Sequence, residues 1–153
     1  MKRAIFAICI GLCAAGATQA LAADEPENVI KYRQAVMKAI GGHIGAIAGV
    51  VKGEVSYTGD VAAHARGIQE MSQLVSKLFP KGTDSGMHKN TRALPAIWQD
   101  WDKFGAAVKA FQDASANLVK IAEAGDPAAF GGGLQGLGKS CGGCHKPFRA
   151  EKE

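Results

Sequence analysis

Cysteine is scarce in this sequence. Only four cysteines occur among its 153 residues, Cys9 and Cys13 near the start and Cys141 and Cys144 near the end. This count excludes a disulfide-rich scaffold, in which several bridges replace a hydrophobic core. A dominant charge of one sign is also missing, with 18 basic against 14 acidic side chains. Because no strongly basic face is indicated, we expect no nucleic-acid binding.

Long hydrophobic runs are rare as well. A short apolar stretch lies at the start of the sequence. Residues 1–22 have the pattern of a secretory signal peptide, in which Lys2 gives positive charge and residues 5–12 form an apolar stretch too short to span a bilayer. A small-x-small cleavage site follows. We therefore expect export to the periplasm and a mature chain, residues 23–153, without a membrane span. A retained membrane anchor and a lipoprotein modified at Cys13 are the weaker alternatives.

Strand-like alternation of apolar and polar residues is absent after residue 22. Apolar residues instead recur every three or four positions, which is typical of helices with one buried face. The length suits one domain with one core. The sequence thus predicts an all-α, antiparallel four-helix bundle in a single domain. The helices are expected at about 27–52, 58–80, 95–125 and from 126 onward.

Proline, glycine and aspartate set the expected ends of the last two helices. Pro95 is tolerated in a first turn, and Gly125 is expected to end the third helix in a left-handed conformation. Asp126 is expected to cap the fourth helix, with Pro127 at its first position. Pro147 lies inside the continuation of that helix and removes one N–H donor, so we expect a kink or a weak turn there.

The strongest local signal is the motif Cys141-Gly142-Gly143-Cys144-His145. Residues three apart lie on one side of a helix, so both thiols can reach the two vinyl groups of one porphyrin. The adjacent histidine can bind iron through its neutral imidazole. Cys-x-x-Cys-His is the attachment signature of c-type haem. The motif predicts one covalent haem c, held by Cys141 and Cys144, with His145 as the proximal iron ligand.

Other interpretations of the motif are weaker. A structural zinc site needs further cysteine or histidine ligands at matched spacing. A thioredoxin-like dithiol expects a preceding strand and a βαβ unit. A simple disulfide would leave His145 without a role. We also expect no enzyme, because no distal histidine is paired with an arginine for acid–base chemistry.

With this motif near its end, the chain resembles the class II c-type cytochromes, which are four-helix bundles. They include cytochrome c-prime and its low-spin relatives of the cytochrome c-556 type. The resemblance covers essentially the whole mature chain, and it implies a homodimer formed through the first two helices. The matching pieces are residues 31–37, 51–54, 78–80, 95–98 and 141–149.

The resemblance also implies roles for individual residues. The residue that faces the iron on the distal side falls on Met37, which would be the sixth ligand in the low-spin branch. Some five-coordinate members also have a methionine there, so a core thioether beside the haem is the alternative. The family uses an arginine at the place of Arg33 to meet a haem propionate, with Gln34 beside it. Arg149 matches the family pattern and is a further candidate for a propionate contact.

The function expected from these residues is one-electron transfer in the periplasm. A low-spin iron held by His145 and Met37 keeps its coordination in both oxidation states, and the partners would be other redox proteins. The alternative is a five-coordinate cytochrome c-prime that binds nitric oxide or carbon monoxide. His43, His64 and His88 are interpreted as ordinary helix-surface or loop residues.

Overall fold

The computed structural model describes residues 24–151, so the predicted signal peptide lies outside the described residues. Within this range the chain is helical, and its one β feature is an isolated bridge between Ala93 and Arg149. The all-α prediction is therefore confirmed. The elements are α1 (Pro26–Val51), η1 (Thr58–Asp60), α2 (Val61–Ser72), η2 (Val75–Leu78), α3 (Ala96–Gln99), α4 (Trp101–Glu123) and α5 (Pro127–Phe148).

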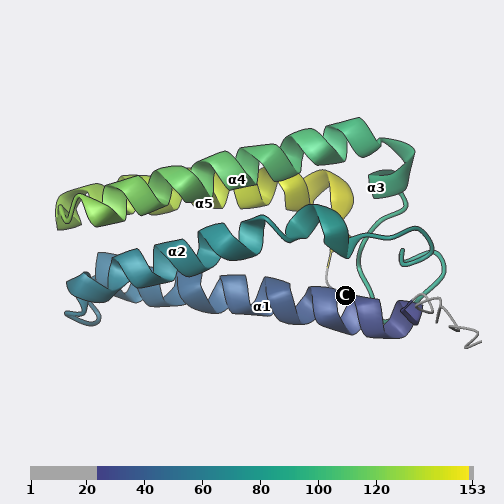
Figure 1. Ribbon diagram of the computed structural model, residues 1–153, viewed down its shortest axis with the longest axis horizontal. Coiled ribbons are helices and arrows are strands. Elements are labelled where there is room, and N and C mark those ends of the chain that lie inside the picture. Colours follow the sequence, from purple (N-terminus) through teal and green to yellow (C-terminus); the bar gives the residue numbers. More distant parts are fainter. Residues whose placement is uncertain (1–23, 152–153) are drawn as a thin grey trace, which may run out of the picture.

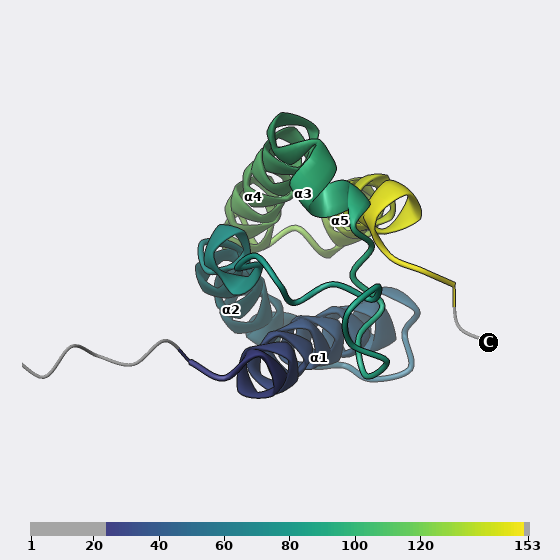
Figure 2. The same cartoon turned by 90° about the vertical axis from the view of Figure 1, so that its right-hand side faces the viewer.

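The four long helices form the predicted antiparallel bundle (Figure 1). Helices α1, α2, α4 and α5 run alternately in opposite directions, each beside its neighbour in the sequence, and α1 also packs against α5. Figure 2 looks along the bundle and shows the four helices at the corners of a square. Residues 79–95 cross one end of this square, the end at which α5 finishes.

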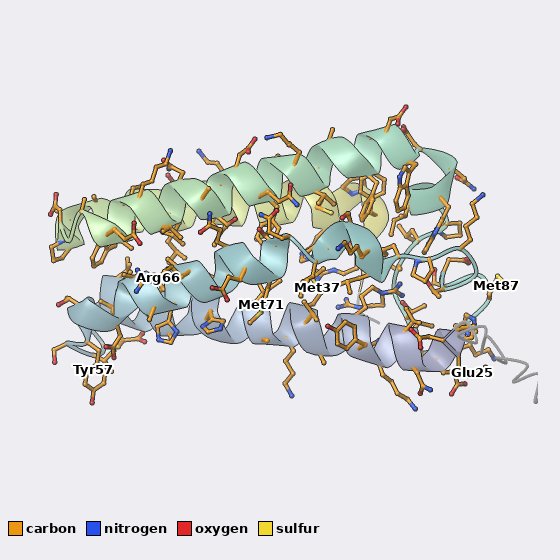
Figure 3. All side chains as sticks on the ribbon, viewed as in Figure 1. Glu25, Met37, Tyr57, Arg66, Met71 and Met87 are labelled. Carbon is orange, nitrogen blue, oxygen red and sulfur yellow. The ribbon has the colours of Figure 1, made fainter. Side chains whose placement is uncertain are left out.

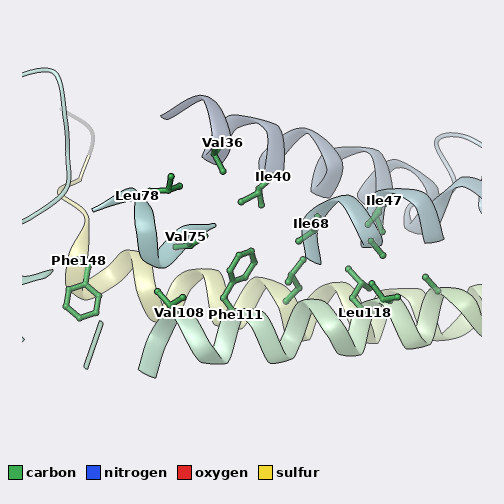
Figure 4. Packing of buried hydrophobic residues seen from close by; sticks show 14 of the residues in the cluster. Val36, Ile40, Ile47, Ile68, Val75, Leu78, Val108, Phe111, Leu118 and Phe148 are labelled. Atoms are coloured by element: carbon green, nitrogen blue, oxygen red, sulfur yellow. The ribbon is translucent and has the colours of Figure 1, made fainter. Parts of the chain in front are cut away.

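The apolar stripes meet in one continuous core (Figure 4). At the end covered by residues 79–95, the ring of Phe104 packs edge to face against the rings of Phe79 and Phe148, with centroids 4.9 and 5.4 Å apart. These aromatic rings come from α4, from the start of the 79–95 segment and from α5. The core along the bundle is made by Val36, Ile40, Ile47, Ile68, Val75, Leu78, Val108, Phe111, Leu118 and others.

The helix predicted over residues 58–80 is interrupted. A short 3-10 turn precedes α2, and α2 ends at Ser72, after which η2 continues as a second 3-10 turn. The buried hydroxyl of Ser72 donates to the carbonyl oxygen of Gln69 at 2.6 Å and accepts from the hydroxyl of Ser115 on α4 at 3.2 Å. Ser72 thereby joins the end of α2 to α4.

The helix predicted over residues 95–125 is also divided. Its first turn is the separate helix α3, because Asp100 adopts φ −134° and ψ 70°. The side chain of Asp100 then accepts from the backbone N–H of Lys103 at 3.1 Å and caps α4. The sequence prediction missed this cap because the apolar spacing continues across it.

The other helix ends agree with the prediction. Gly125 adopts φ 74° after α4, and the side chain of Asp126 accepts from the backbone N–H of Ala128 at 3.0 Å. Pro127 is the first residue of α5. Helix α5 continues through Pro147 and ends at Phe148, so the weakness expected at this proline falls in the last turn.

Helix α1 is the one described helix that is long and apolar enough to cross a membrane by length and composition. A core helix of a bundle meets the same criteria. Ile40 and Ile47 of α1 are buried in the common core with residues of α2, α4 and α5. We therefore interpret α1 as a bundle helix.

Candidate haem-binding site

A cavity of about 300 Å³ lies where residues 79–95 cross the bundle. This volume is at the lower end of the range typical of cofactor pockets. Every long helix except α2 contributes to its wall, together with η2, α3 and the crossing segment. The apolar lining consists of Met37, Val75, Phe79, Ala93, Ile97, Phe104 and Phe148.

Helix α5 brings the predicted attachment motif to this cavity. Cys144 and His145 line it, whereas Cys141, one turn earlier, is half-buried and packs against the core. Both thiols are free rather than joined in a disulfide. They lie three residues apart on one continuous helix, which is the placement that attachment to a single porphyrin requires.

Burial keeps the thiols and the imidazole of the motif neutral. Desolvation, with a smaller contribution from Cys141, raises the pKa of Cys144 to about 11, and desolvation also raises the pKa of Cys141. Thiolate is then scarce at neutral pH, which argues against a reactive redox dithiol. Desolvation, followed by the positive charges of Arg149 and Arg92, lowers the pKa of His145. The neutral imidazole is the form that binds iron.

The polar part of the cavity lining can pair with the two propionate groups at the edge of a haem. Arg92 and Arg149 both line the cavity and are exposed to solvent on their other side. A guanidinium group pairs well with a carboxylate because its donors form a planar fork. Arg92 was not identified from the sequence, since it lies in a loop without periodicity. With the apolar wall and the motif on α5, the residues present fit haem c.

Arg33 lines the same cavity but also holds the crossing segment. It is only 3% exposed. Its NH1 atom donates to the carbonyl oxygen of Leu78 at 3.1 Å and to the hydroxyl of Thr83 at 2.9 Å. Its NH2 atom donates to the carbonyl oxygen of Thr83 and to the hydroxyl of Thr91, both at 2.9 Å. The guanidinium also lies 4.6 Å from the centroid of the Phe79 ring.

Gln34 adds a second link, because its side-chain amide donates to the carbonyl oxygen of Asn90 at 2.6 Å. The propionate contacts of Arg33 and Gln34 stay predictions. Their attachment to residues 79–95 is a role that the sequence did not show, because the partners of Arg33 lie 45 to 58 positions away along the chain.

The crossing segment is joined to the end of the chain as well. The backbone N–H of Leu94 donates to the carbonyl oxygen of Phe148 at 3.0 Å, and that of Ala150 donates to the carbonyl oxygen of Arg92 at 2.9 Å. These bonds flank the bridge between Ala93 and Arg149. The segment therefore ties the first half of α1 to the residues that directly follow the haem motif.

Met37, labelled in Figure 3, reaches the cavity from α1. His145 reaches it from α5. The thioether of Met37 is half-buried. A thioether in this wall suits either ligation of iron or packing beside the haem. His43, His64 and His88 are not part of the lining.

Comparison with known proteins places the chain in one family. A family model described as Cytochrome C' matches residues 28–149. Cytochrome c' of Rhodospirillum rubrum is 37% identical over 99% of this chain and 100% of its own length. Cytochrome c-556 of Agrobacterium fabrum is 35% identical over 99% and 97%.

Solved structures of the family have the same fold. Cytochrome c' from Rhodobacter spheriodes, 31% identical, superposes with a TM-score of 0.78 and covers 84% of this chain and 100% of its own. A nitric oxide complex of a variant of cytochrome c prime from Alcaligenes xylosoxidans, 32% identical, has a TM-score of 0.75 and covers 83% and 98%. The predicted resemblance, fold and cofactor are confirmed. The chain belongs to the cytochrome c' family, and its cofactor is a covalently attached haem c.

Proposed function

We propose that this protein is a monohaem cytochrome whose iron is bound by His145 on one side and is accessible to nitric oxide or carbon monoxide on the other. The observation that carries the proposal is the cavity itself, in which the imidazole of His145 on α5 shares the lining with apolar side chains from α1, η2, α3 and α4. Small uncharged gases need no polar partner in such a space. Variants of cytochrome c prime from Alcaligenes xylosoxidans whose structures contain nitric oxide or carbon monoxide support the same proposal.

In this proposal each residue of the site has a defined task. Cys141 and Cys144 hold the haem through thioether bonds, and His145 supplies the proximal ligand. Arg149 and Arg92 neutralise the propionates at the cavity mouth. The bound haem supplies the iron centre that takes up a gas molecule or an electron, and the protein sets its ligand, its orientation and its access to water.

The buried Arg33 and the exposed Gln34 each contact a propionate while holding the crossing segment on α1. Met37 packs on the distal face as a flexible apolar side chain. The Arg33 contact can be tested through the haem reduction potential, because loss of a positive neighbour favours the oxidised form.

One observation favours a second function, electron transfer by a low-spin iron. The Met37 thioether lies in the wall of the cavity, and some relatives are named cytochrome c-556 and cytochrome c-554. If Met37 ligates the iron, the coordination is the same in both oxidation states and little reorganises on electron transfer.

Optical spectra and carbon monoxide titration of the reduced protein separate the two functions. We expect high-spin spectra and carbon monoxide binding in the wild type, in Met37→Ala and in Met71→Ala. Met71 is the matched control, because it packs against the core without lining the cavity. A low-spin wild type that binds carbon monoxide only after Met37→Ala would instead establish the electron carrier.

We further propose that the protein is exported to the periplasm after removal of residues 1–22 and exchanges electrons there with other redox proteins. Haem attachment by the motif on α5 supports export, and no catalytic activity of its own is expected. Cell fractionation and the mass of the mature chain test the export, and sedimentation tests the predicted homodimer.

A further inference from the structure

Two histidines that the sequence analysis set aside meet between α1 and α2, outside the haem cavity. His43 on α1 and His64 on α2 are both half-buried, and their Nδ1 atoms lie 2.9 Å apart. The ring centroids are 5.2 Å apart, and the ring planes are tilted by 59°. The antiparallel pairing of the two helices brings these side chains together, which their positions in the sequence did not show.

The contact between the Nδ1 atoms limits the chemistry of the pair. One Nδ1 must carry a hydrogen and the other must accept it, since two lone pairs at this distance would repel. A cation that replaces the shared proton can be bound by both lone pairs. We propose that His43 and His64 form a chelating site for a divalent late transition-metal ion, and that Cu²⁺ is the ion it fits best.

The distance between the two nitrogens selects the coordination geometry. With metal–nitrogen bonds of about 2.0–2.1 Å, a separation of 2.9 Å corresponds to an angle of about 90° at the metal. Tetrahedral coordination, which Zn²⁺ prefers, would need about 3.3 Å between the nitrogens. Tetragonal sites with nitrogen and oxygen ligands are typical of Cu²⁺ and Ni²⁺, and Cu²⁺ binds more tightly in the general affinity series. The present separation of the nitrogens is therefore close to the one that such a site requires.

Gly67 gives the His43 ring its place over α2. A Cβ atom at position 67 would lie 2.8 Å from Nε2 and 2.9 Å from Cε1 of His43, closer than real Cβ atoms approach. Any other residue would therefore displace the ring away from its present position. Because Gly67 follows His64 by three residues, the same turn of α2 provides one ligand and the space for the other.

The site is open rather than closed. Within residues 24–151, no group of three or more histidine, cysteine, aspartate or glutamate side chains is placed to hold a metal ion. The remaining coordination positions would be filled by water, so the affinity rests on the two imidazoles. His43 follows Met37 by six residues on α1, a rise of about 9 Å along the helix axis. The site is therefore separate from the haem and independent of the function proposed above.

Copper titration of the intact holoprotein tests the proposal. By calorimetry we expect one Cu²⁺ ion per chain, bound more tightly than Zn²⁺, with hyperfine coupling to two nitrogens in the electron paramagnetic resonance spectrum. His43→Ala and His64→Ala should each weaken Cu²⁺ binding at least about 10-fold. His88→Ala should leave it unchanged, because His88 bonds within its loop to the carbonyl oxygen of Gly82.

A fourth variant, Gly67→Ala, keeps both imidazoles and should still weaken binding, because the added methyl group displaces the His43 ring. A double variant, His43→Ala with His64→Ala, that binds Cu²⁺ as tightly as the wild type would overturn the proposal. Absence of nitrogen coupling in the wild-type spectrum would overturn it too. Thermal melting of each variant shows whether a loss of binding comes from unfolding.

Discussion

Replacing Arg33 by methionine tests whether this side chain holds the crossing segment on α1. Methionine has a similar length and can stay buried, but it donates no hydrogen bonds. The carbonyl oxygens of Leu78 and Thr83 would lose their bonds from Arg33. The hydroxyls of Thr83 and Thr91 would be less affected, because they keep bonds to the carbonyl oxygen of Pro80 and the N–H of Ala93.

The expected loss follows from the two carbonyl groups. A buried polar group without a partner costs about 1–3 kcal/mol, so Arg33→Met should lower the free energy of unfolding by about 2–6 kcal/mol. This is a large part of the roughly 5–15 kcal/mol of an ordinary domain. With a urea m value of about 2 kcal/mol per M, a loss of about 4 kcal/mol moves the unfolding midpoint down by about 2 M.

Urea unfolding of the holoprotein, followed by far-UV circular dichroism, measures this loss. Arg66→Met is the matched control. Arg66 makes an ion pair of 2.9 Å with Glu123, but both side chains are about half exposed, at 50% and 51%. Such a surface pair contributes about 0–1 kcal/mol. If Arg33→Met costs no more than Arg66→Met, then the crossing segment is held by other contacts and the reasoning about Arg33 is refuted.

Three further predictions concern the haem and α5. Acid-acetone extraction should leave the haem on the polypeptide, and Cys141→Ala or Cys144→Ala should weaken its retention; complete extraction from the wild type would contradict covalent attachment. The haem-free double variant Cys141→Ser with Cys144→Ser should lack a sharp cooperative melt, since an empty cavity of about 300 Å³ costs up to about 7 kcal/mol; a melt near that of the holoprotein would disprove that folding depends on the haem. Gly133→Ala should destabilise the protein by about 1–3 kcal/mol, because its Cβ would lie 2.9 Å from Cδ1 of Leu118. Gly132→Ala, with no neighbour within 4 Å, should stabilise it by up to about 1 kcal/mol, and equal effects of the two changes on the melting temperature would refute this packing argument.

The parts of the fold that are encoded locally could be predicted from the sequence. The apolar spacing located the long helices, and Gly125 and Asp126 marked the boundary between α4 and α5 because each acts through its own backbone or a neighbour two residues away. The haem motif was recognisable for the same reason, since its chemistry lies within five consecutive residues. The breaks at Ser72 and Asp100 were missed, because the apolar pattern continues across both. At Asp100 a side-chain cap overrides that pattern.

The parts of the site that depend on distant residues could not be predicted. Arg92 reaches the cavity because its segment is held by the side chains of Arg33 and Gln34 and pairs with the end of the chain. His43 and His64 are 21 positions apart, and neither helix pattern marks them as neighbours. Their pairing depends on the relative rotation of α1 and α2, which a pattern of apolar residues fixes only approximately.

The hydrogen bonds of Arg33 also have a kinetic consequence. Most contacts in a helical bundle join residues near in sequence, and such contacts form early in folding. The bond from Arg33 to Thr91 instead closes a loop of 58 residues, and the ordering of that loop is entropically costly. We therefore expect this cluster to form after the rate-limiting step. Arg33→Met should then speed unfolding in proportion to the stability it removes, while leaving the folding rate nearly unchanged.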